Sequence, residues 1–94
     1  MKIDTTQILI AAKTYQQNRE KENWDKTKDQ KRVYENMTEA GLSTPYSVAG
    51  TFIAKTKEDK IFVLDIGRKK IEMGIYDDFA DYAASKQDLN PWIK

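Results

Sequence analysis

The chain has 94 residues, of which 39% are hydrophobic and 33% charged, and its formal net charge is +1. This is the length of one domain with a small core, and the composition is that of a globular chain rather than a disordered one. Because the sequence contains neither Cys nor His, it excludes disulfides, thiolate chemistry, and the commonest general base and transition-metal ligand. We therefore expect a single domain over residues 1–94, without a cofactor or a metal.

The N-terminal segment lacks the apolar core of a signal peptide. The longest apolar run, Ile8–Ala12, is far shorter than the ~20 residues that span a bilayer. These features predict a soluble protein of the cytoplasm, the host cytoplasm if the chain is phage-encoded, with no membrane association.

Residues 1–42 have the pattern of a helical part. Asp4 and Gln7 have the spacing of a capping box, which satisfies free amides at a helix start. Ile8, Ala12 and Tyr15 then recur at helical intervals. We expect a helix that begins near residue 5.

The middle of this helical part is polar over residues 16–32, and apolar residues at helical spacing resume before Gly41, which suits the left-handed position after a helix. Two arrangements fit. One is a helix pair broken near residues 23–27, with a second capping box formed by Thr27 and Gln30; the other is one long helix. We favour the pair, because about 35 residues greatly exceeds the usual helix length.

Residues 46–94 are predicted to hold a sheet and a last helix. Alternating apolar residues predict strands, separated by a polar loop and a Gly-containing turn. The expected strands are 47–56, 61–66 and 70–75. The predicted fold class is α+β, with an N-terminal helical half, a three-stranded antiparallel meander and a C-terminal helix packed on one face.

The last helix is expected to begin at Asp77 or Asp78, since a carboxylate caps free amides and suits the positive end of a helix. Its expected buried stripe is Phe79, Ala80, Tyr82, Ala83 and Ala84. The last six residues are apolar for a chain end, and Trp92 is expected to dock on the domain or to anchor a partner.

Residues 62–84 carry a recognisable order of residue types. An apolar strand, 62–66, is followed by Gly67-Arg68-Lys69, then a strand, 70–74, the pair Tyr76-Asp77, and a helix rich in Ala. In this order the segment resembles the DNA-binding domain of plant ethylene-response factors and its relatives in phage integrases and homing endonucleases. The resemblance covers about a quarter of the chain.

This resemblance implies DNA binding by the sheet face opposite the helix, at the positions of Ile61, Val63, Asp65, Lys70 and Glu72. Only Lys70 among them is basic. Glu72 stands where that family has Trp, and a DNA duplex would repel its carboxylate. The basic residues that are candidates for gripping phosphate from the loop ends are Lys55, Lys57, Lys60, Arg68, Lys69 and Lys70. DNA binding is therefore the alternative hypothesis.

No phosphate-binding loop, nucleotide fingerprint or catalytic-serine elbow occurs in the sequence. The densest acidic cluster is Asp77, Asp78 and Asp81, which a helix cap explains better than a Mg²⁺ site. We predict that the protein is not an enzyme.

The favoured hypothesis is a small interaction protein that binds a larger protein, such as a nuclease or a nucleoprotein complex. In size and composition alone the chain is similar to phage inhibitors of the anti-CRISPR type. Aromatic anchors dominate interface energies, which makes Trp24 and Trp92 candidates; Trp24 otherwise folds back onto the core. The acidic candidates, which would imitate phosphates, are Asp77, Asp78, Asp81 and Tyr82.

Overall fold

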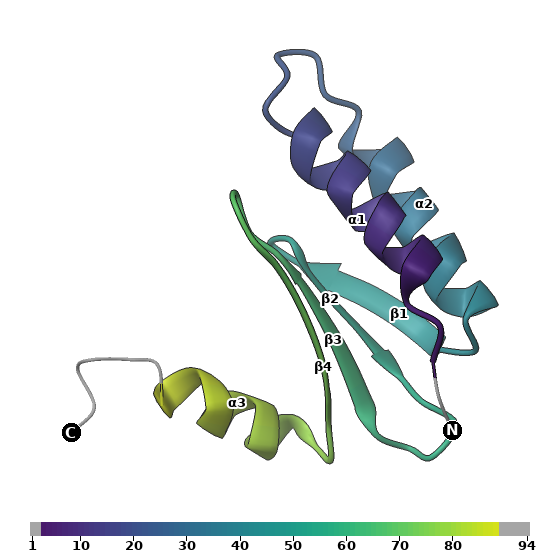
Figure 1. Ribbon diagram of the computed structural model, residues 1–94, viewed down its shortest axis with the longest axis vertical. Helices are drawn as coiled ribbons and strands as arrows, with labels where there is room; N and C mark the ends of the chain where they lie inside the picture. Colours follow the sequence, from purple (N-terminus) through teal and green to yellow (C-terminus); the bar gives the residue numbers. More distant parts are fainter. Residues whose placement is uncertain (1–2, 89–94) are drawn as a thin grey trace.

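The computed structural model describes residues 3–88. Three helices and four strands follow one another as α1 (Thr6–Asn18), α2 (Lys26–Glu39), β1 (Ser43–Val48), β2 (Thr51–Lys55), β3 (Ile61–Ile66), β4 (Ile71–Tyr76) and α3 (Phe79–Asp88). The strands form one antiparallel meander in the order β1-β2-β3-β4. The helix pair α1–α2 lies on one side of this sheet and α3 projects from the other (Figure 1). The α+β class is confirmed, with four strands in place of three.

The helical half is a pair, as favoured from the sequence. The predicted Asp4–Gln7 capping box is wrong: Thr5 stands at the cap position of α1 without a side-chain cap bond, and the Asp4 carboxylate accepts from the Thr6 amide at 3.0 Å just before the helix. The second capping box was predicted wrongly: Asp25 is the cap of α2, and its carboxylate accepts from the Lys28 amide at 3.2 Å. Thr27 already lies inside the helix, so its side chain is past the position from which a cap reaches the free amides.

The end of α2 follows the expected glycine motif. Gly41 has a φ of +97°, the Leu42 amide donates to the Met37 carbonyl at 3.1 Å, and the Gly41 amide donates to the Thr38 carbonyl at 3.0 Å. This pair of bonds satisfies two of the free carbonyls at the helix end.

The expected first strand is in fact two strands. Ala49 and Gly50 both have positive φ, 51° and 87°, and they form a two-residue hairpin turn closed by the Val48–Thr51 pair. Two positive φ angles give the turn whose twist matches antiparallel strands. Because β1 is an edge strand, it also tolerates Pro45, which has no amide for the ladder.

The main core lies between the helix pair and the inner face of the sheet. Phe52 of β2 is fully buried, and the rings of Tyr15 and Tyr34 meet it edge-on with centroids 5.4 Å away, a favourable aromatic geometry. The buried members of this cluster are Ile8, Ala11, Ala12, Tyr15, Val33, Met37, Leu42, Phe52, Ala54, Phe62, Leu64 and Ile66. The face of β3 that carries Phe62, Leu64 and Ile66 thus faces the core, and the helices that cover it are α1 and α2.

The predicted buried stripe of α3 is wrong. Phe79 is 49% exposed, Ala80, Ala83 and Ala84 are exposed, and Tyr82 is half-buried. The core described above contains no residue of α3. The physical reason is that the helix pair already occupies the apolar inner face, so α3 leaves the sheet on the opposite side (Figure 1).

The face turned away from α1 and α2 is called the outer face below. Strand pairing places Tyr46, Ile53, Val63 and Gly74 in one row across this face. Val63 is buried there although no helix of the pair covers it. Within the described residues, no helix is long and apolar enough to cross a membrane.

Candidate functional site

The β4–α3 junction holds the predicted acidic residues together. Asp77, Asp78 and Asp81, called the acidic turn below, are all exposed. The Asp78 carboxylate accepts a hydrogen bond from the Asp81 amide at 2.9 Å, so Asp78 is the residue that caps α3, one of the two predicted for that role. The cap holds the acidic turn in a defined geometry at the base of the projecting helix.

Asp77 is engaged by a basic residue of the β2–β3 loop. The Lys60 ammonium donates to the Asp77 carboxylate at 2.6 Å. This hydrogen bond, and next the attraction between the two charges, lowers the pKa of Asp77 and raises the pKa of Lys60. The negative charge of Asp77 is therefore largely offset, and Asp78 and Asp81 are the carboxylates that contribute net charge to the acidic turn.

A pair of tyrosines joins α3 to β4. Tyr82 packs edge-on against Tyr76 of β4, with ring centroids 5.3 Å apart. The Tyr76 ring lies over Gly74, where a Cβ would come within 3.1 Å of it. Gly74 therefore gives Tyr76 the room to lie flat on the outer face and to support Tyr82.

The structure separates the six predicted basic residues into two groups. Three of them, Lys55, Lys57 and Lys60, belong to the β2–β3 end of the sheet, and Arg68, Lys69 and Lys70 form the β3–β4 turn. Strand β3 lies between these groups, and its six residues put them about 20 Å apart. Ion pairs also engage part of each group: Lys55 with Asp59 at 3.2 Å and Lys70 with Glu72 at 3.6 Å.

The sheet face that the family resemblance assigns to DNA is mixed in character. Ile61 and Val63 are buried on it, and Glu72 is half-exposed beside Lys70. At the five positions assigned by the resemblance, this face therefore offers one basic side chain, two acidic ones and apolar surface, and not the row of basic side chains that a duplex favours.

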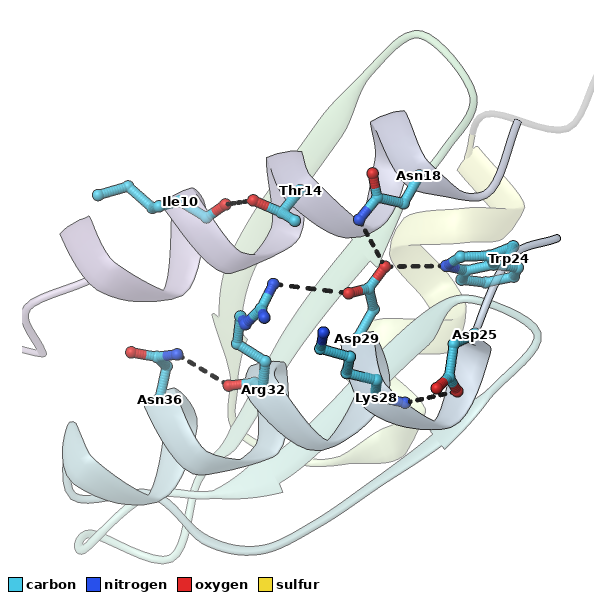
Figure 2. A network of polar contacts seen from close by, with 9 residues as sticks. All are labelled: Ile10, Thr14, Asn18, Trp24, Asp25, Lys28, Asp29, Arg32 and Asn36. Carbon is cyan, nitrogen blue, oxygen red and sulfur yellow. Dashed lines mark hydrogen bonds and ion pairs between the residues drawn. The ribbon is translucent and has the colours of Figure 1, made fainter. Parts of the chain in front are cut away.

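Trp24 folds back onto the core, the first of the two possibilities raised by the sequence. Its ring meets Tyr15 edge-on at 5.0 Å, and its Nε1–H donates to Oδ2 of Asp29 at 2.8 Å. Figure 2 shows the indole directed toward Asp29 from the loop between α1 and α2. Trp92, the other aromatic candidate, lies outside the described residues.

Asp29 is a structural residue that the sequence reasoning missed. Its carboxylate points from α2 toward α1 (Figure 2), is only 4% exposed, and accepts from Asn18 at 3.0 Å as well as from Trp24. Arg32 contacts its other oxygen at 3.5 Å. Its position in the sequence could have indicated that it is buried, because Asp29 lies four residues before the buried Val33 and thus on the same face of α2.

A second missed feature is an apolar hollow on the outer face, with a volume of about 320 Å³. Among its lining side chains are Tyr46, Ile53, Ile61 and Phe79. Tyr46 is 44% exposed, and Val48, the next residue on this face of β1, is 65% exposed. The alternation of Tyr46 and Val48 with Ser47 could have indicated this surface, had a separate strand been recognised there.

Comparison with protein-family models, with curated proteins and with solved structures finds no match for this chain. Among the described residues, no group of three or more His, Cys, Asp or Glu side chains is placed to hold a metal ion. The candidate site is therefore defined by geometry alone: the acidic turn, Tyr82 and the exposed surface of α3.

Proposed function

We propose that this protein is a non-enzymatic interaction protein, and that it binds a basic surface of a larger protein through α3 and the acidic turn. The target class that suits this chemistry is a nucleic-acid-processing protein, such as a nuclease or a nucleoprotein complex. The protein would act there as an inhibitor or modulator, in the manner of the phage inhibitors of host defence.

The observation that carries this proposal is the position of α3. It projects from the sheet (Figure 1) and adds nothing to the main core. A helix of 10 residues is shorter than the ~12–15 residues that hold as a helix alone in water. A helix of this length with so few internal contacts gains stability when another surface packs on it, which is the behaviour of a contact element.

The chemistry of α3 supports a basic target. Asp78 and Asp81 place two exposed carboxylates within one turn, and the cap bond and the Tyr76–Tyr82 contact hold them on ordered backbone. Lys and Arg side chains that bind phosphates also bind carboxylates, with charge-assisted hydrogen bonds. The acidic turn would therefore compete with nucleic acid for the same positive surface.

The test is a binding measurement on a purified target, identified by cross-linking the protein in its source cells. We expect the double variant Asp78→Asn with Asp81→Asn to raise Kd about tenfold, a loss of about 1.4 kcal/mol. Asn retains the capping oxygen at position 78, so the variant removes charge while α3 stays capped. Added nucleic acid should displace the wild-type protein from the target.

Glu35→Gln serves as the matched control, because Glu35 is an exposed carboxylate of α2 on the opposite side of the sheet. An equal loss of affinity in Glu35→Gln and in the double variant would contradict the proposed site. So would a target that binds nucleic acid and this protein at the same time without competition.

A second candidate function is DNA binding, and one observation favours it: Arg68, Lys69 and Lys70 are all exposed at a single turn. This function predicts duplex binding that weakens steeply with salt, with a smaller salt slope when these three residues are replaced by Ala. Absence of duplex binding at 50 mM salt would rule out this candidate and leave the first one intact.

A further inference from the structure

The apolar hollow on the outer face has aromatic side chains on two sides. Its volume is about 320 Å³, and its lining includes Tyr46 and Ile53 from the sheet and Phe79 from the start of α3. Tyr46 is 44% exposed and Phe79 is 49% exposed. A large aromatic side chain buries about 150–250 Å² when it is fully covered. Two half-exposed rings at one hollow therefore leave apolar area that a further side chain can cover.

The chain itself continues from α3 with apolar residues that can reach this hollow. Helix α3 ends at Asp88, and the six residues after it, which lie outside the described residues, include Leu89, Trp92 and Ile93. From Phe79 to Asp88 the helix is about 14 Å long at 1.5 Å per residue. Four residues of extended chain span about 13 Å, and an indole adds the length of its own side chain. Trp92 is therefore the first large apolar side chain that can return to the level of Phe79.

The sequence of this segment also favours a return. Pro91 cannot continue a helix, and it disfavours helical backbone at the residue before it, so the path of the chain changes directly after α3. We propose that the segment 89–94 folds back along α3 and that the indole of Trp92 fills the hollow between Tyr46 and Phe79.

Attachment to α3 selects this segment over a free occupant. A short tether holds its end at an effective concentration of about the millimolar range. A second copy or a separate protein at micromolar concentration has to bind far more tightly to compete. The polar edge of the indole also suits the site, because the lining residues Thr44 and Tyr46 carry hydroxyl groups that can accept from its N–H.

This contact leaves the acidic turn open and does not depend on the proposed function. At 100° per residue, Asp81 lies about 160° around α3 from Phe79, and so on the side away from the hollow. Docking of Trp92 adds a second attachment of α3 to the sheet, besides the contact of Tyr82 with Tyr76. The segment thus acts as a strap that fixes the short helix, and with it the direction of the acidic turn.

The test is tryptophan fluorescence of the full chain. The sequence holds two Trp residues, so Trp24→Phe leaves Trp92 as the single one. We expect its emission to be shifted to shorter wavelength than that of N-acetyltryptophanamide in water, equally at 1 µM and at 100 µM protein. Phe79→Asp and Tyr46→Lys, each made in the Trp24→Phe background, should shift the emission to that of the free compound. Asp suits the first turn of a helix, so Phe79→Asp preserves the start of α3.

Ile10→Lys in the same background is the matched control, because Ile10 is an apolar side chain of α1 that is 52% exposed; it should leave the emission unchanged. Far-UV circular dichroism confirms that each variant is folded. The difference spectrum between the wild type and Trp92→Phe gives the emission of Trp92 without a change at Trp24.

Three results overturn the proposal. The first is emission at the wavelength of the free compound, whatever else covers the hollow. The second is a shift to shorter wavelength that appears only at 100 µM, because a second copy then supplies the indole. The third is a shift that Phe79→Asp and Tyr46→Lys both leave unchanged, because Trp92 then docks elsewhere.

Discussion

Removal of the Asp29 carboxylate tests the account of the helix pair. The carboxylate accepts from Trp24 at 2.8 Å and from Asn18 at 3.0 Å, and it is 4% exposed. A hydrogen bond to a charged group contributes about 1.5–3 kcal/mol to stability. Both donors are half-buried, so water compensates part of the loss. Each of the two hydrogen bonds is therefore expected to contribute about 1.5 kcal/mol. The Arg32 contact at 3.5 Å involves an exposed guanidinium and adds little.

We therefore expect Asp29→Ala to lower the free energy of unfolding by about 3 kcal/mol, which for a domain of this size is a fall in Tm of about 12–24 °C. Asp29→Asn should cost less, because one oxygen acceptor remains. Urea unfolding followed by circular dichroism measures both values. Glu35→Ala, an exposed residue on the same helix, is the control and should change the free energy by at most about 0.5 kcal/mol.

A double-mutant cycle with Trp24→Phe separates the hydrogen bond from the packing of the ring. Phe retains contact with Tyr15 but has no N–H, so the coupling energy between positions 24 and 29 should be about 1 kcal/mol or more. A coupling energy near zero, or an Asp29→Ala variant that loses less than 1 kcal/mol, would refute the view that this carboxylate holds the loop against the core.

Three further outcomes follow from particular residues. Gly50→Ala should cost about 1–2 kcal/mol in urea unfolding, since φ is +87° and a Cβ would lie 3.3 Å from the Ile66 carbonyl oxygen; no loss would mean that the turn is not as described. Gly74→Ala should displace the Tyr76 ring and change the near-UV circular dichroism of the tyrosines, whereas an unchanged spectrum would contradict their contact. Lys60→Met removes the ion pair between Lys60 and Asp77. The stabilisation lost with this ion pair should be fully present at pH values between 3.8, the ordinary pKa of Asp, and 10.5, the ordinary pKa of Lys. It should vanish as the pH falls through the lowered pKa of Asp77 or rises through the raised pKa of Lys60, and a Tm difference that persists at pH 2 would contradict the ion pair.

The sequence alone determined the elements whose signals are local. Apolar spacing marked both helices of the pair and the strands β3 and β4, Gly41 marked the end of α2, and the pair Asp77 and Asp78 marked the start of α3. The acidic turn was predicted for the same reason, because a cap involves residues that are neighbours in the chain. The turn at Ala49–Gly50 was missed, because an Ala with positive φ gives no sequence signal and Gly50 also fits the alternation of a strand.

Tertiary structure alone decided which surfaces meet. The inner face of the sheet can be covered once, and α1–α2 cover it, so the apolar residues of α3 remain exposed. The packing of α2 on α1 and on Trp24 likewise buries Asp29, which belongs to a stretch that is polar in sequence. Periodicity shows which side of a helix or strand is apolar, but it does not identify the surface that side packs on, because that depends on contacts between residues distant in sequence.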